Sequence, residues 1–142
     1  MNHINLDAIS EIFVLSQVTR VPVAPVFMRH VVAFRGMVLP VVDLAPFLGE
    51  SVRATVTHRT GVAVHLDVPN PSFALVLDSV VSVATGKAQP DASADLPFFV
   101  DAEMSLPKGV TAWNVSPLRI EKFILGQLSS AQRKFGVAYD EQ

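Results

Sequence analysis

Apolar side chains alternate with smaller or polar ones in two stretches near the middle of the chain. Large apolar residues occupy every second position of residues 62–66 and again of residues 73–77. Strict alternation over such a length is typical of a half-buried β-strand. The connection between the two stretches contains Pro69 and Pro71. The pattern therefore predicts a hairpin, followed by a further strand over residues 79–84.

A second hairpin is predicted earlier in the chain. Residues 31–34 and 37–43 form two largely apolar runs on either side of Arg35 and Gly36. A two-residue turn needs positive φ, which glycine adopts without steric cost, so Gly36 should take that position and Arg35 should project at the tip. Pro40 cannot donate a hydrogen bond to a neighbouring strand. We therefore expect its strand to lie at a sheet edge or to bend at a barrel corner.

A helix is predicted near the C-terminus. Ser116 is a good N-cap and Pro117 suits the first helical position. Apolar residues then recur at helical spacing, namely Ile120, Ile124, Leu128, Ala131 and Phe135. Gly126 weakens this helix by about 1 kcal/mol relative to alanine, so a break at that residue is the alternative.

Shorter elements complete the pattern. Residues 43–49 suit a short helical turn, with Asp43 near its start and Gly49 as its stop. Residues 7–14 predict either a helical turn or the end of a strand, and residues 110–115 predict a last strand. Several short strands and one terminal helix indicate a mostly β fold of the small-barrel type.

The composition agrees with this class and excludes several functions. A chain of 142 residues is long enough for one domain with a core of its own, and we expect residues 1–142 to form it. Half of the residues are apolar, and the β-branched valines among them favour strands. The absence of cysteine excludes disulfides, thiolate zinc sites and a cysteine nucleophile.

The charge balance argues against nucleic acid and membrane surfaces as partners. The formal net charge is −2 and the isoelectric point is near 6.0, without a block of lysine and arginine. No apolar run approaches the roughly 20 residues of a membrane span, and the N-terminus lacks a signal-peptide pattern. We therefore expect a soluble, cytoplasmic protein. Its mean hydropathy of +0.40 is high for such a chain and favours an apolar surface for a partner.

Two groups of side chains resemble parts of metal or catalytic sites. His65 and Asp67 lie on one face of their predicted strand, but a third ligand at a suitable spacing is missing. Asp78 and Ser79 lack the glycine-containing elbow and the oxyanion hole of a hydrolase. We therefore predict no enzymatic activity, no metal and no cofactor.

Arg35 and Glu11 are better candidates for recognition. An arginine at a turn supported by Gly36 gains nothing from burial, and its planar guanidinium suits a carboxylate on a partner. Glu11 stands between Ile9 and Ile12 beside an apolar stretch. Ordinary solvated side chains are the alternative interpretation for both.

Five motifs, in this order along the chain, resemble the CheW-like domain family of bacterial chemosensory adaptors. They are residues 9–12 (ISEI), 17–20 (QVTR) leading to Pro25, 31–36 (VVAFRG), 40–44 (PVVDL) and 74–80 (ALVLDSV). The ordered set is specific, whereas any single motif would be weak. The resemblance extends from Leu6 to the C-terminal helix. Residues 86–108 match poorly, and residues 86–95 among them predict a loop.

The resemblance implies a pair of intertwined SH3-like β-barrels and a non-catalytic adaptor. The adaptor would couple the cytoplasmic tip of chemoreceptors to a CheA-type histidine kinase in a signalling array. A hydrophobic groove between the barrels would bind the receptor, and a barrel end would bind the regulatory domain of the kinase. The positions that carry over as partner contacts are Ile9, Glu11, Ile12, Arg35, Gly36, Asp78 and Val80. Of these, Asp78 and Val80 would face the kinase or a second CheW-like domain.

Two departures from the family pattern bear on the partners. The family begins with a strand ahead of the segment that matches residues 4–12, and almost nothing precedes that segment here. The first barrel is therefore expected to be incomplete, with an open edge that a partner or a second copy could complete by β-augmentation. His30 stands where the family usually has glycine. Both departures favour a divergent adaptor, for example of a pilus-type or twitching-type system.

Two other functions remain open on sequence grounds. A small β-barrel that binds an apolar ligand would explain the high mean hydropathy. A degenerate domain that mainly oligomerises through an open strand edge would follow from a missing strand.

Overall fold

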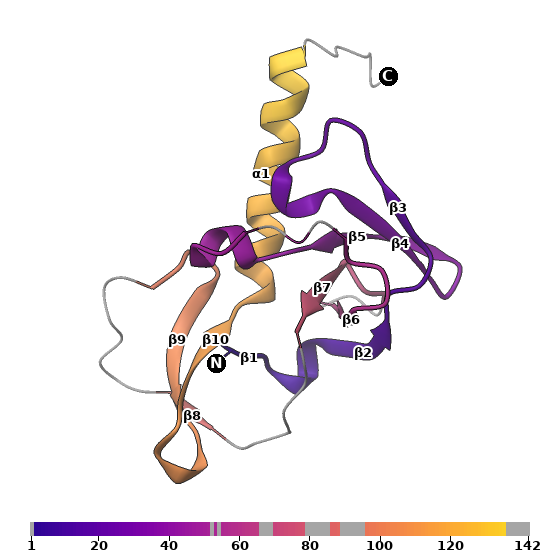
Figure 1. Ribbon diagram of the computed structural model, residues 1–142. Helices are drawn as coiled ribbons and strands as arrows, with labels where there is room; N and C mark the ends of the chain where they lie inside the picture. The colour runs from indigo at the N-terminus through magenta and orange to yellow at the C-terminus, as the bar shows by residue number, and fades with distance from the viewer. Residues whose placement is uncertain are drawn as a thin grey trace.

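Two β-sheets and one C-terminal helix, α1 (Pro117–Phe135), make up the computed structural model, as the sequence predicts (Figure 1). The structure describes residues 2–51, 53, 55–65, 70–78, 86–88 and 96–135. The larger sheet contains β2 (Ile9–Val14), β3 (Val18–Arg20), β4 (His30–Phe34), β5 (Met37–Val42), β6 (Thr60–Val64) and β7 (Phe73–Leu77). The smaller sheet contains β1 (Asn2–His3), β8 (Lys87–Ala88), β9 (Val100–Ser105) and β10 (Thr111–Val115). Short 3₁₀ helices in the described connections are η1 (Leu6–Ala8), η2 (Val26–Met28), η3 (Ala45–Leu48) and η4 (Pro107–Gly109).

The six-stranded sheet closes into a barrel. Its strand order is β2-β6-β7-β5-β4-β3, so its two outermost strands are consecutive in the chain. At the corner between them, the Leu15 N–H donates to the Arg59 carbonyl at 2.9 Å, and the Leu15 carbonyl accepts from the His58 N–H at 2.7 Å. Two residues after Leu15, the Gln17 carbonyl accepts a hydrogen bond from the Ala33 N–H at 3.1 Å. One bent segment thus pairs with both ends of the sheet.

The β6–β7 hairpin is shared by two hydrophobic cores. The sequence prediction of this hairpin is confirmed, with Val64 opposite Phe73. Its small residues, such as Ala63 and Ala74, face the barrel interior, where they contact the first core. Val76 faces the same interior, whereas the other large residues, Val62, Val64, Phe73 and Leu75, face a second core, which the four-stranded sheet and α1 complete. The prediction of half-buried strands is wrong, because a different core covers each face.

The predicted hairpin around Gly36 is also confirmed. Phe34 pairs with Met37, and the turn residues Arg35 and Gly36 have φ values of 49° and 76°. Of the two alternatives for Pro40, an edge strand or a bend at a barrel corner, the edge strand is wrong, because β5 lies between β4 and β7. The pairing between β5 and β7 begins at Val41. Pro40, which has no backbone N–H to donate, therefore lies just before this ladder.

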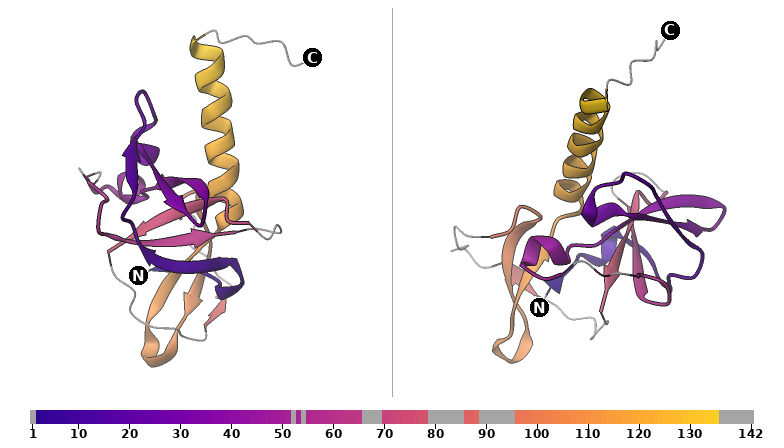
Figure 2. Two further views of the ribbon diagram at one scale, coloured as in Figure 1. Left: turned by 90° about the vertical axis from the view of Figure 1, so that its right-hand side faces the viewer. Right: turned by 45° about the horizontal axis from the view of Figure 1, so that its top comes forward.

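The helix α1 begins where the sequence predicts. The Ser116 hydroxyl accepts a hydrogen bond from the Arg119 N–H at 3.3 Å, and the Ser116 carbonyl accepts from the Ile120 N–H at 3.2 Å. Ile120 and Ile124 are buried in the second core. The helix continues through Gly126, so the alternative of a break there is wrong. The distal part of α1 extends beyond both sheets (Figure 2).

The four-stranded sheet has the order β1-β10-β9-β8 among the described residues. Its outer strands β1 and β8 comprise two residues each, and β1 pairs with β10 in the parallel direction. The two-residue edge strands therefore belong to this sheet. The strand β9 lies within residues 86–108 and was not predicted, although Val100, Ala102 and Met104 alternate with polar residues along it.

Candidate interaction surface

Glu11 and Arg35 form an ion pair on the barrel surface. Glu11 lies on β2 and Arg35 at the β4–β5 turn, and these strands are not neighbours in the sheet. Barrel closure brings them together. The side chains are 35% and 66% exposed, respectively, and the Arg35 guanidinium lies 5.2 Å from the centre of the Phe34 ring. Arg35 is therefore exposed as predicted, but it is oriented by a carboxylate and an aromatic ring instead of projecting freely.

A groove of about 470 Å³ opens beside this ion pair. It is lined by Ile9, Ser10, Phe34, Arg35, Met37, His65, Asn70 and Pro71. The lining comes from β2, from the β4–β5 turn and from the connection between β6 and β7. The groove thus lies at the barrel end that carries Arg35, and it contains two of the predicted contact residues.

An apolar row continues from the groove along β2. Ile12 and Val14 are 47% and 58% exposed, although both have large aliphatic side chains. Ile9, at the start of the same strand, is partly buried against the second core. A β-bulge between Ile9 and Glu11 shifts the register, and Glu11 then stands opposite Ala63. Ile12 stands opposite Val62, so Ile12 and Val14 lie on the other face of the strand from Glu11.

A second ionic cluster lies at the other end of the barrel. Asp43 follows β5 and is buried, with 6% of its side chain exposed. Its carboxylate accepts hydrogen bonds from the Ala45 N–H at 3.0 Å and the Arg53 N–H at 3.2 Å, and it forms an ion pair with the Arg53 guanidinium. Asp43 thus starts η3, which ends at Gly49 with φ of 76°, as the sequence predicts.

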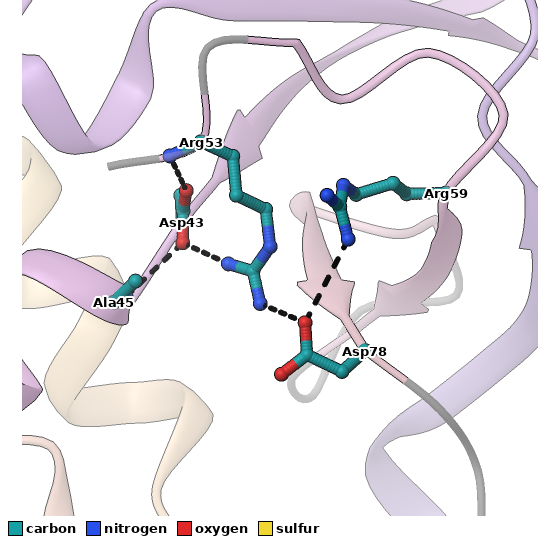
Figure 3. A network of polar contacts seen from close by, with 5 residues as sticks. All are labelled: Asp43, Ala45, Arg53, Arg59 and Asp78. Carbon is teal, nitrogen blue, oxygen red and sulfur yellow. Dashed lines mark hydrogen bonds and ion pairs between the residues drawn. The ribbon is translucent and has the colours of Figure 1, made fainter. Parts of the chain in front are cut away.

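The Arg53 guanidinium bridges two carboxylates. Figure 3 shows it between Asp43 and Asp78, with Arg59 approaching the same Asp78 oxygen from another side. The Arg53 Nη2 to Asp78 Oδ1 distance is 2.5 Å, and the Arg59 Nη1 to Asp78 Oδ1 distance is 3.8 Å. The hydrogen bond from Arg53, followed by its charge, lowers the pKa of Asp78. Burial lowers the pKa of Arg53, but its hydrogen bonds and the charges of Asp78 and Asp43 outweigh that influence and raise it.

His30 lies next to this cluster. It lines a small enclosed cavity together with Arg29, Asp43 and Arg53. Burial, and then the charges of Arg20 and Arg29, lower the pKa of His30, while the charge of Asp43 acts in the opposite direction. The His30 backbone sits in the regular strand β4, opposite Val41. It therefore does not occupy a positive-φ position that would require glycine.

The predicted contact residues fall into two groups. Ile9, Glu11, Ile12, Arg35 and Gly36 gather at the groove end of the barrel. Asp78 lies at the opposite end of β7, five strand residues away, which corresponds to a distance on the order of 17 Å. Val80 lies outside the described residues, as do Ser79 and Asp67 of the hydrolase and metal interpretations. Within the described part of the chain, no three histidine, aspartate or glutamate side chains cluster in a way that suits a metal.

Sequence reasoning missed Arg53 and the role of Asp43 as its partner. Arg53 follows the stop signal of η3 in an otherwise unremarkable segment, GESVRATV, and nothing local marks it. Its role depends on the ion pair with Asp78, which is distant in sequence. No described helix is sufficiently long and apolar to cross a lipid bilayer.

Comparisons with known proteins place this geometry in a family context. A family model described as a CheW-like domain matches residues 3–110, and it continues through the segment where the motifs resemble the family poorly. No match was found among curated proteins. A similar solved structure is the scaffolding protein TtCheW from Thermoanaerobacter tengcongensis. It has a TM-score of 0.64 and 18% sequence identity, over 81% of this chain and 80% of that one. This likeness establishes the shared fold.

Proposed function

Because the chain belongs to the CheW-like domain family, we propose that it is a non-catalytic adaptor that couples chemoreceptors to a CheA-type histidine kinase. The observation that carries this proposal is the exposed Glu11–Arg35 pair beside an open groove and an exposed apolar row. Oriented charges next to exposed aliphatic side chains are typical of surfaces that bind other proteins. We propose that the adaptor works in a cytoplasmic signalling array, as part of a divergent, pilus-type chemosensory system.

The receptor contact in this proposal is the groove end of the barrel. An amphipathic helix from the receptor tip would place its apolar stripe against Ile12 and along the groove. Glu11 and Arg35 would then select its orientation, because each charge favours an opposite charge on the helix and disfavours a like charge. The Phe34 ring beneath Arg35 limits the freedom of the guanidinium, which lowers the entropic cost of binding.

The kinase contact in this proposal is the opposite end of the barrel, where Asp78 is 74% exposed and held by Arg53. Two contact regions at opposite ends would let one adaptor hold both partners at the same time. Such simultaneous contact is what coupling requires. Val80, close to Asp78 in sequence, belongs to the same proposed contact.

The alternative of an apolar ligand inside the barrel has less support. The described barrel interior is filled by side chains such as Leu15, Val32 and Leu39, each at most 2% exposed. A packed interior of this kind leaves no room for a ligand of ordinary size. Oligomerisation through an open strand edge stays a prediction, which sedimentation of the purified chain would test.

The proposal can be tested with the purified chain, a receptor cytoplasmic fragment and the CheA-type kinase of the same organism. Calorimetric titration should show binding of the wild-type chain to both partners. Arg35→Ala and Glu11→Lys should weaken receptor binding about tenfold or more, because they remove or reverse an oriented charge. Lys87→Ala, an exposed change on the other sheet, serves as the matched control and should bind normally.

Thermal unfolding should accompany these titrations, so that a loss of binding is not confused with a loss of fold. Exchanging the two charges in the double variant Glu11→Arg, Arg35→Glu should restore the ion pair but not the receptor affinity. Failure of the wild-type chain to bind either partner would reject the adaptor function. Normal receptor binding by both single variants would reject this surface as the receptor contact.

A further inference from the structure

The loop between β3 and η2 carries an unusual residue at its tip. Val23 has φ of 57° and is 85% exposed. Among the described residues with positive φ, it is the only one with a β-branched side chain; the other non-glycine residues are Arg35, His58 and Lys108. A β-branched side chain in this region is sterically strained, and an exposed valine gains nothing from burial. Both the conformation and the exposure of Val23 are therefore unfavourable in the isolated chain.

The surrounding structure holds the loop in this conformation. The Val21 N–H donates to the Arg29 carbonyl at 2.7 Å and closes the loop at its base. The Met28 N–H donates to the Pro25 carbonyl at 3.0 Å, and Met28 is buried in the second core together with its neighbour Phe27. Pro22 and Pro25 restrict the backbone on both sides of the tip. A strained backbone conformation persists only where the surrounding contacts hold it in place, and such residues are concentrated at functional sites.

The loop projects away from the barrel (Figure 1). It lies at the end opposite the groove. Its position follows from the register, because it precedes His30, which pairs with Val41 at the far end of the hairpin from Arg35. Asp43 and Asp78 lie at this same end. The loop is thus continuous with the surface that we assign to the kinase, and not with the surface that we assign to the receptor.

Positive charge flanks the base of the loop. Arg20 and Arg29 stand on the two sides of the loop base, and the charges of both reach His30 between them. The next exposed apolar residue along the loop is Val26, at 44%. The chain as a whole carries a formal net charge of −2, so this local positive border is distinctive. Charge complementarity calls for carboxylates around the pocket that receives the tip.

We propose that Val23 is a preformed apolar anchor that inserts into a pocket bordered by carboxylates on the regulatory domain of the kinase. This inference rests on the proposed adaptor function and adds a specific contact to it. Because the loop is already rigid, binding orders little additional chain. The strain at Val23 is tolerated in the free adaptor because the exposed side chain contributes to the complex.

The test is a substitution that should make the chain more stable and the complex weaker. Asparagine tolerates positive φ, so Val23→Asn should raise the Tm by about 2–4 °C. It removes the apolar anchor, so the affinity for the kinase should fall about tenfold or more, with the receptor affinity unchanged. The matched control is Val38→Asn, at a valine 69% exposed on the regular strand β5. That variant should not raise the Tm and should bind the kinase normally.

Charge variants supply a second readout. In Arg20→Gln and Arg29→Gln, the kinase affinity should depend less steeply on salt concentration than in the wild-type chain. If Val23→Asn binds the kinase as tightly as the wild-type chain does, the anchor is rejected while the adaptor function stands. If Val23→Asn lowers the Tm, or weakens receptor and kinase binding equally, the anchor is likewise rejected. A wild-type chain that binds neither partner rejects the adaptor function and, with it, the kinase as the occupant of this site.

Discussion

The two ends of the barrel carry the same chemical pair in different surroundings. At the groove end, Glu11 and Arg35 are largely solvated, and at the other end Asp43 and Arg53 are mostly enclosed. An exposed ion pair contributes little to stability, because water and salt screen it and both side chains lose freedom. An enclosed pair depends on both partners, because removing one leaves a charge without solvation. Burial therefore decides whether such a pair serves recognition or holds the fold together.

The enclosed end also connects more elements. The Asp43 carboxylate starts η3 through Ala45 and fixes the segment around Arg53 through its backbone N–H. Arg53 then extends the connection to the end of β7 through Asp78. The exposed pair, in contrast, joins only β2 and one turn. We expect mutations at the two ends to separate stability from binding, and the predictions follow in order of expected effect on stability.

The largest effect is expected for Asp43→Ala. The substitution removes two backbone hydrogen bonds and leaves the mostly buried Arg53 guanidinium without its enclosed partner. Breaking a buried ion pair in this way should lower the free energy of unfolding by about 3–5 kcal/mol. Urea denaturation followed by circular dichroism would measure it. Asp43→Asn keeps an acceptor for the Ala45 N–H and should lose less; equal losses in both variants would show that the charge alone, and not this hydrogen bond, accounts for the effect.

Asp78→Asn should have a smaller effect, because this carboxylate is 74% exposed. We expect a loss of about 0.5–1 kcal/mol near neutral pH. Arg53 lowers the pKa of Asp78 in the folded state below its ordinary value of 3.8. The contribution is therefore fully present above pH 3.8 and is lost as the pH falls through the folded-state pKa. In Asp78→Asn the acid limb of the stability curve should be shallower; an unchanged limb would contradict this assignment.

His30 should give a pH dependence in a different window. Its folded-state pKa lies below the ordinary value of 6.5, so the unfolded chain binds a proton more readily. Stability should therefore be highest above pH 6.5 and should decrease as the pH falls toward the folded-state pKa. Thermal unfolding of wild-type and His30→Gln chains between pH 8 and about pH 5 would measure the difference. If the dependence of stability on pH is the same in His30→Gln as in the wild-type chain, a group other than His30 causes it.

The smallest effect on stability is expected for Arg35→Ala, at less than about 1 kcal/mol. Denaturation at low and high salt should show that this small effect shrinks further with screening. The same variant should nevertheless weaken receptor binding, as described above. A stability loss as large as that of Asp43→Ala would contradict the proposed difference between the exposed and the enclosed ion pair.

Local sequence signals predicted the features that depend on a few adjacent residues. Gly36 marked a hairpin turn, Gly49 the end of η3, and Ser116 with Pro117 the start of α1, because each has a backbone requirement that its neighbours do not change. The motifs around Glu11 and Arg35 named residues that the fold brings together at the groove end of the barrel. They did not show that the two side chains form an ion pair.

Long-range features were beyond such signals. The partner of Arg53 depends on barrel closure, and the position of Pro40 within the sheet depends on which strand pairs with β5. Val23 also escaped notice, because valine is ordinarily a strand former and the sequence PVAP gave no sign of positive φ. The partner of Arg53 and the place of β5 depend on contacts between segments that are distant in sequence, so reading each segment alone could not reveal them.

The β6–β7 hairpin, covered on both faces, has a consequence for how its register is specified. Polarity cannot distinguish the two faces, since both are apolar. Size can: a Cβ added to Gly61 would lie 2.7 Å from the Leu15 Cδ2, whereas the large valines Val62 and Val64 fill the opposite core. A slip by one residue would force Thr60 or Val62, depending on its direction, into the space that glycine leaves for Leu15. Steric exclusion by one leucine thus enforces the alignment of a strand whose hydrophobic pattern alone would allow two.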